Sequence, residues 1–133
     1  MCLVTYQKEP IQLDKDLIVW KEVCVNPDTN ETESVFFKFF WEKGVLHETE
    51  LNKTEDLDYY DDTVGNHYDI LCREDNIRNA RLIRIGGGFH AFCSEERIPD
   101  ISYKTIKRFL IPKGSLVYYD ETGLIVSNQM MLL

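Results

Sequence analysis

The chain has 133 residues, of which 44% are hydrophobic, 29% are charged and 12% are aromatic. This length and balance are typical of one globular domain with its own core, so we expect residues 1–133 to form a single domain without extensive disorder. Acidic residues outnumber basic ones by 23 to 15, and the formal net charge of -8 argues against direct binding of nucleic acid or of an anionic membrane surface.

Four cysteines, Cys2, Cys24, Cys72 and Cys93, are spread along the chain. The first residues lack the basic and apolar regions of a signal peptide, and no apolar run approaches the roughly 20 residues that cross a bilayer. We therefore expect a cytoplasmic protein whose thiols are reduced and mostly buried.

The N-terminal half begins with two segments typical of strands. Residues 17–25 (LIVWKEVCV) are rich in β-branched and aromatic side chains and predict a strand. A polar, turn-rich segment follows, and residues 34–41 (SVFFKFFW) predict a second strand that forms a hairpin with the first. Because both faces of the second strand are largely apolar, we expect it to be central or covered on both sides.

The middle of the chain is more polar. Residues 45–51 predict a short edge strand, and residues 52–66, rich in acidic and amide side chains, predict a solvated loop or a frayed helical turn. Residues 67–72 and 80–85 predict two further strands, with a polar turn between them.

The C-terminal part predicts a series of short strands. They cover residues 103–111, 116–119, 124–127 and 130–133, and turn-forming residues separate them. No segment has the length and periodicity of a long amphipathic helix. The predicted fold is therefore mainly β, with α+β left open: a compact antiparallel or mixed sheet with one or two short helices.

The most unusual local feature is the run Gly86, Gly87 and Gly88. Residues without a Cβ atom permit close approach by a ligand or by another strand. The run lacks the spacing and the Lys-Ser/Thr pair of a phosphate-binding P-loop. A bulge or a tight strand connection is the favoured interpretation, and a ligand-binding loop is the alternative.

Three titratable side chains follow the glycines closely. His90 has the chemistry of a general base or of a ligand-binding group, although a histidine on an apolar strand is more often bonded to the backbone in the core. Glu95 and Glu96 would supply acid–base chemistry if they converged on a cleft, but an exposed turn is the favoured interpretation. We assign no catalytic residue and keep these three as candidates, with the three glycines and His90 as candidate ligand-binding residues.

Metal binding has little support. His90 and Cys93 have an H-x-x-C spacing that would need Cys72 or His67 to complete a zinc site, and structural zinc sites usually show two close ligand pairs. A nucleophilic pair of Cys93 and His90 has no stronger support, because such pairs are built by the fold. The acidic residues 55–62 lack the central glycine of a calcium-binding EF-hand loop. We therefore predict no metal and no cofactor.

The C-terminal third resembles a group of uncharacterised small bacterial and phage-encoded proteins. The resemblance rests on residues 87–92 (GGFHAF), residues 111–115 (IPKGS), Tyr118-Tyr119 and residues 126–128 (VSN). It implies a compact β-rich domain of bacterial, phage or mobile-element origin, and no established activity.

A more distant likeness is to ADP-ribosyltransferase-like folds, in which a strand with small and aromatic residues precedes a late glutamate. The characteristic Arg-Ser-Glu or His-Tyr-Glu set cannot be placed here, because Glu121 lies in a predicted turn and no early Arg or His begins a strand.

Three functions remain open. The first is a non-catalytic protein-interaction module, such as a phage inhibitor of a host protein, since the surface is acidic and no complete catalytic set is present. The second is a small-ligand-binding protein or enzyme with its site in residues 86–96. The third is a structural subunit of a phage particle or a homo-oligomer, motivated by the apolar residues 34–41. The first predicts a protein partner.

Overall fold

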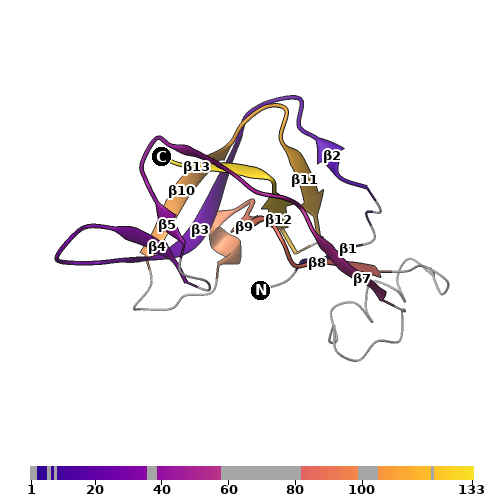
Figure 1. The fold of residues 1–133 in the computed structure, drawn as a ribbon, viewed down its shortest axis with the longest axis horizontal. Helices are drawn as coiled ribbons and strands as arrows, with labels where there is room; N and C mark the ends of the chain where they lie inside the picture. The colour runs from indigo at the N-terminus through magenta and orange to yellow at the C-terminus, as the bar shows by residue number, and fades with distance from the viewer. Residues whose placement is uncertain are drawn as a thin grey trace.

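The computed structural model describes residues 3–5, 7, 9–35, 39–57, 82–98, 105–120 and 122–133. These residues form two antiparallel sheets (Figure 1). The smaller sheet has three strands in the order β1 (Leu3–Thr5), β8 (Leu82–Ile85) and β7 (Lys53–Leu57). The prediction of a mainly β fold is confirmed.

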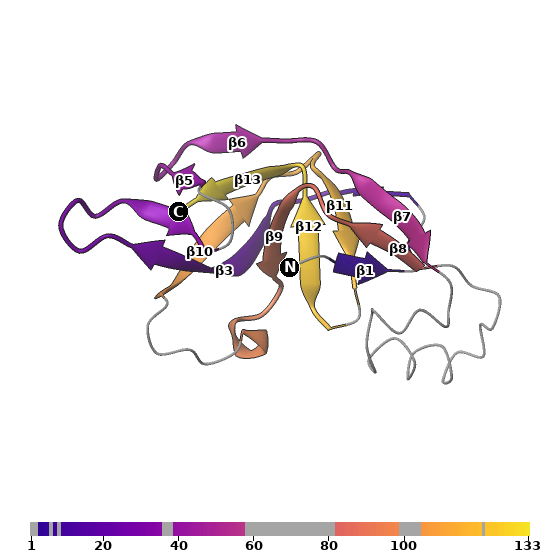
Figure 2. The ribbon, with the colours of Figure 1, turned by 60° about the horizontal axis from the view of Figure 1, so that its bottom comes forward.

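The larger sheet has ten strands. Eight of them lie in the order β2 (Ile11–Gln12), β11 (Leu116–Tyr119), β12 (Leu124–Ser127), β9 (Phe89–Phe92), β3 (Leu17–Val25), β10 (Thr105–Ile111), β13 (Gln129–Leu132) and β6 (Leu46–Glu48). The other two, β4 (Thr32–Ser34) and β5 (Phe40–Trp41), pair with each other, and β4 also pairs with β3. Figure 2 shows these strands fanning out side by side, with the smaller sheet at one end.

Helical structure is minimal in the described part of the chain. A three-residue 3-10 turn, η2 (Glu95–Arg97), follows β9, and the predicted one or two short helices are not confirmed. No helix among the described residues is long and apolar enough to cross a membrane.

The sheet changes direction at Asn128, the single residue between β12 and β13. On one side of this residue β12 pairs with β9 and β11, and on the other side β13 pairs with β10 and β6. The Asn128 backbone N–H donates to the Leu116 carbonyl at 3.1 Å, and its side-chain oxygen accepts from the Leu116 N–H at 2.9 Å. These two bonds hold the corner against β11.

Two apolar clusters stabilise the fold. The larger one lies within the curved ten-stranded sheet and contains the fully buried Val19, Phe109 and Ile125. The smaller one lies between this sheet and the three-stranded sheet and contains Leu3 and Val126. Because successive side chains of a strand point to opposite faces, β12 contributes to both clusters, and all four of its residues are buried.

Several predicted strands are confirmed. The strand at Leu17–Val25 has the predicted bounds, as do Leu116–Tyr119 and Leu124–Ser127. The last predicted strand corresponds to β13, and the predicted short edge strand corresponds to β6, which ends the strand order.

The prediction of one strand over residues 34–41 is wrong. The chain reverses there, so that β4 and β5 run antiparallel, with Thr32 opposite Trp41. The Ser34 N–H donates to the Phe39 carbonyl at 2.9 Å, and the Trp41 indole N–H donates to the Ser34 hydroxyl at 2.9 Å. Phe39 and Trp41 both contribute to the larger apolar cluster.

The loop predicted for residues 52–66 is also wrong in part, because Lys53–Leu57 forms β7. This polar segment forms a strand because β8 offers it a free edge, and backbone pairing satisfies its N–H and C=O groups. Residues 58–81, which include the predicted strand at 67–72, lie outside the described residues.

Candidate ligand-binding site

A cavity of about 210 Å³ lies beside the place where β3 and β9 meet. For comparison, an apolar cavity of about 150 Å³ is large enough to bind benzene. The present cavity therefore has room for one aromatic ring with small substituents. Its lining combines apolar and aromatic side chains, glycine backbone and a few polar groups: Lys21, Glu22, Ser34, Val35, Phe39, Gly86, Gly88, Phe89, His90, Phe92 and Leu124.

The cavity exists because β3 and β9 separate. On one edge, β3 pairs with β10 through seven consecutive residue pairs. On the other edge, it pairs with β4 through three residue pairs, from Val23 to Val25, and with β9 only at Trp20 and Phe92. Away from that one pair the space between the strands is not closed by a ladder, and it is lined by Lys21 and Glu22 from β3 and by His90 from β9.

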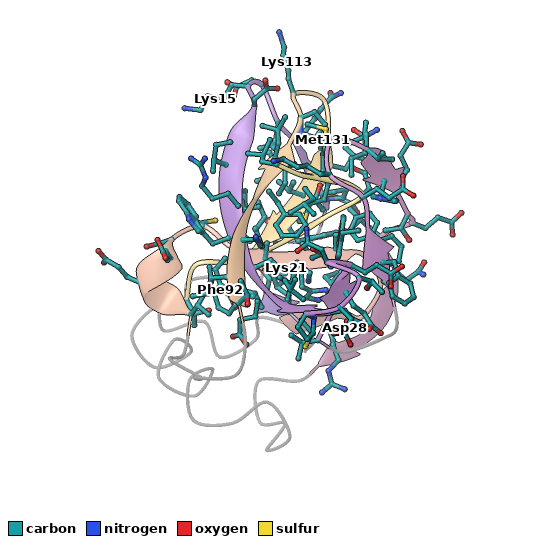
Figure 3. The ribbon with its side chains drawn as sticks, turned by 90° about the vertical axis from the view of Figure 1, so that its left-hand side faces the viewer. Lys15, Lys21, Asp28, Phe92, Lys113 and Met131 are labelled. Carbon is teal, nitrogen blue, oxygen red and sulfur yellow. The ribbon has the colours of Figure 1, made fainter. Side chains whose placement is uncertain are left out.

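Lys21 occupies a core-facing position of β3. The side chains of Val19 and Val23, two residues before and after it, are fully buried on the same face of the strand. Figure 3 shows Lys21 within the body of the molecule, whereas Lys15 and Lys113 extend from its top and are exposed. Lysine rarely occupies such a position unless its ammonium group has a partner or a function.

The Lys21 amine is held by one hydrogen bond. Its Nζ donates to the backbone carbonyl of His90 at 2.7 Å. Burial lowers the pKa of Lys21 from 10.5 to about 8, and the negative charge of Glu22 opposes part of this shift. Lys107 lies directly opposite on β10 but is exposed. A substantial fraction of Lys21 is consequently a neutral amine near pH 8.

His90 is neutral and has one unused nitrogen. Its Nδ1 lies 3.2 Å from the Gly88 carbonyl oxygen, and because a carbonyl only accepts, this contact assigns the ring proton to Nδ1. Nε2 therefore carries a lone pair, and this buried atom has no hydrogen-bond partner in the described part of the protein. Burial and then the Lys21 charge lower the pKa of His90 to about 4, against the opposing effect of the Gly88 and Ile85 carbonyls.

The three glycines join β8 of the small sheet to β9 of the large sheet. Gly88 has a φ of +119°, and a Cβ atom there would lie 2.5 Å from Val126 Cγ1 and 2.7 Å from Leu51 Cδ2. A Cβ atom on Gly87 would lie 2.8 Å from the side chain of Asn52. The backbone carbonyl of Asn52 accepts from the Gly86 N–H at 3.1 Å. The segment is thus a tight strand connection, and its backbone also forms part of the cavity wall.

The candidate residues from the sequence separate into two groups. Gly86, Gly88 and His90 line the cavity, together with residues from β3 and β4. Glu95 and Glu96 lie in η2, are exposed and do not line it. Gly87 is not among the lining residues, and its close neighbour is Asn52.

Cys93 lies at the end of β9 and packs against the larger apolar cluster. Burial and then the charge of Asp120 raise the pKa of its thiol, so that the nucleophilic thiolate is disfavoured. The other residues considered for a zinc site, Cys72 and His67, lie outside the described residues. In the part of the chain that is described, no three His, Cys, Asp or Glu side chains are grouped in a way that could hold a metal ion.

Sequence reasoning overlooked Lys21. The signal was present, because residues 17–25 alternate so that Leu17, Val19, Val23 and Val25 share one face and Lys21 falls in the middle of it. A charged residue in the apolar phase of a predicted core strand marks a buried charge, and a buried charge is a candidate functional group.

Comparisons with protein-family models, with curated proteins and with solved structures give no match to this chain. The chemistry of the cavity must therefore be derived from its own residues. Its lining residues include three phenylalanines for apolar contact, Lys21, whose amine donates a hydrogen bond, and His90, whose buried Nε2 has no partner among the described residues. Apolar walls with a few convergent polar groups of shifted pKa are typical of small-molecule sites.

Proposed function

We propose that this protein binds a small, neutral aromatic molecule in the cavity between β3 and β9. The observation that carries the proposal is the unpartnered Nε2 of His90 in a residue that lines the cavity. A buried polar atom without a partner costs free energy, and a ligand hydroxyl or N–H that donates to it removes that cost.

The remaining lining residues narrow the ligand class. The rings of Phe39, Phe89 and Phe92 favour an aromatic group, and the volume limits it to about one ring. Lys21 favours a hydrogen-bond acceptor such as a carbonyl oxygen. Glu22 also lines the cavity, so a neutral acceptor is favoured over a carboxylate.

Hydroxybenzamides test the proposal, because they combine a ring, a hydroxyl donor and a carbonyl acceptor without being electrophilic. Titration of the meta and para isomers, followed by amide NMR shifts, should perturb residues of β3, β9 and the glycine connection. His90→Phe removes the acceptor and should weaken binding at least about tenfold, since one lost hydrogen bond to a buried group costs about 1.5 kcal/mol.

Two controls accompany that experiment. Hydroxybenzoates should bind more weakly than the amides, and Lys107→Met, which alters the exposed lysine opposite Lys21, should leave the affinity unchanged. Shifts scattered over the surface, or equal affinity of the wild type and His90→Phe, would rule out the proposed site.

The sequence also led to two other hypotheses, a protein-interaction module and a structural subunit. A protein partner stays a prediction. The structural-subunit hypothesis also stays a prediction, and the segment that motivated it, residues 34–41, is divided between β4 and β5. The cavity therefore supplies the most specific observation for function.

A further inference from the structure

We infer that Lys21 captures aldehydes in this cavity by forming an imine with them. The inference rests on the proposed ligand-binding function and specifies the reactive class of ligand. It begins with the placement of Lys21, which carries a primary amine, among the lining residues of a cavity that is otherwise lined largely by aromatic and apolar side chains.

The hydrogen bonding of Lys21 suits this chemistry. The structure shows one hydrogen bond from Nζ, to the His90 carbonyl. A neutral amine has two N–H groups and a lone pair, so one N–H can remain on this carbonyl while the lone pair attacks. A protonated imine retains one N–H, which matches the single acceptor.

The reaction balances with one proton from solvent and no further reagent. The Nζ lone pair adds to the aldehyde carbon, the C=O bond becomes a C–O single bond, and a proton moves from nitrogen to oxygen. The carbinolamine oxygen then takes a second proton from solvent and leaves as water while a C=N bond forms, and the second amine hydrogen stays on nitrogen, so that the product is a protonated imine. Addition of water reverses the capture.

Burial of Lys21 sets the pH range of the reaction, and the negative charge of Glu22 opposes part of its effect. Glu22 precedes the core-facing Val23 on the same strand, Lys107 lies opposite on β10, and His90 lies on β9. With the pKa of Lys21 at about 8, about a fifth of it is neutral near pH 7.4, against about a thousandth for an exposed lysine. Capture at Lys21 should therefore be faster than at an exposed lysine, and its rate should rise through about pH 8.

The test uses para-hydroxybenzaldehyde with sodium cyanoborohydride, which reduces the imine to a stable secondary amine. Mass spectrometry of peptides should find the label on Lys21 well before other lysines. Lys21→Arg keeps the positive charge but has no comparable nucleophile and should lose the fast label, whereas Lys107→Arg should keep it. Circular dichroism confirms that both variants fold.

The same experiment separates this inference from the proposed function. An excess of hydroxybenzamide should slow the labelling of Lys21. If the amide binds but Lys21 is labelled no faster than exposed lysines, aldehyde capture is overturned and the binding site remains. Labelling of Lys21 that the bound amide does not slow would also overturn the inference, since capture would not occur in the cavity. Absence of both amide binding and selective labelling overturns both proposals.

Discussion

The two edges of strand β3 are closed in different ways. Towards β10, seven consecutive residue pairs form a regular ladder, and the side chains beneath it, such as Val19 and Phe109, are fully buried. On the opposite edge, β3 forms three residue pairs with β4 and one with β9, and Lys21 and Glu22, which lie between these pairs, line the cavity. Where β3 and β9 are not paired, the Lys21 amine donates to the His90 carbonyl, so that this backbone group of β9 still has a partner.

This contrast suggests that stability and function are divided between the two edges. The ladder towards β10 includes the fully buried Val19, Val23, Phe109 and Ile111. The opposite edge contains a buried amine, an unpartnered imidazole nitrogen and space for a ligand, each of which lowers stability in the free protein. Four predictions test this division.

The largest effect is expected at the edge of β3 that pairs with β10. Phe109 is fully buried and its ring centre lies 4.8 Å from that of Trp41, so Phe109→Ala should lower the free energy of unfolding by about 4 kcal/mol in urea denaturation. Phe89→Ala, at the cavity wall, should cost about half as much because that ring is only partly buried. Equal losses would mean that the cavity wall is packed as tightly as the ladder side.

The next effect concerns the glycine connection that borders the cavity. Gly88→Ala combines a φ of +119° with contacts of 2.5 and 2.7 Å to Val126 and Leu51, so it should cost about 3 kcal/mol in thermal or urea denaturation. Gly114→Ala is the matched control, because its φ is +92° but nothing lies within 4 Å of the added atom. It should cost about 1 kcal/mol. A similar cost at both positions would show that backbone strain, and not close packing, constrains Gly88.

A smaller effect concerns the pH dependence of stability. The pKa of His90 is about 4 in the folded protein, below its value of 6.5 in the unfolded chain, so the unfolded state binds the proton first as the pH falls. The contribution of neutral His90 to the free energy of unfolding is therefore complete above about pH 6.5 and decreases as the pH falls towards 4. The wild type should lose about 2 kcal/mol more than His90→Gln over this range, measured by urea denaturation at several pH values. Identical pH profiles would show that His90 is solvated in the folded protein.

The smallest effect is a gain in stability. Lys21→Met keeps an unbranched side chain but removes the buried charge, and it should stabilise the protein by about 1 kcal/mol near pH 7. The gain should shrink as the pH rises from 8 towards 10.5, because wild-type Lys21 becomes neutral in that range. Lys107→Met, at the exposed partner position, should change stability by less than about 0.5 kcal/mol. A loss of stability in Lys21→Met would mean that the bond to His90 outweighs the burial of the charge.

The strands with a clear alternation or clear turn signals could be predicted from the sequence, and β3, β11 and β12 have the predicted bounds. Residues 34–41 could not be assigned correctly, because a segment that is apolar on every side fits a straight strand as well as two short strands that reverse. The strand whose two faces are both buried is β12, which is too short to show this from its periodicity.

The cavity could be predicted only in part. The local sequence made the glycines and His90 candidate site residues. The position of Lys21 on the apolar face of β3 was a further signal that could have been used. The separation of β3 from β9 was not predictable, because it depends on a pairing between Trp20 and Phe92, which are far apart in the chain. Such long-range register is set by tertiary packing and leaves no local pattern.

The corner at Asn128 also has a consequence for synthesis. The strands on its two sides, β12 and β13, come last in chain order, yet they supply partners for β6, β9, β10 and β11. While the ribosome has not yet released residues 124–132, those four earlier strands have open edges that can pair with other nascent chains. Premature termination just before Leu124 would therefore yield an aggregation-prone product that retains most of the strands but neither β12 nor β13.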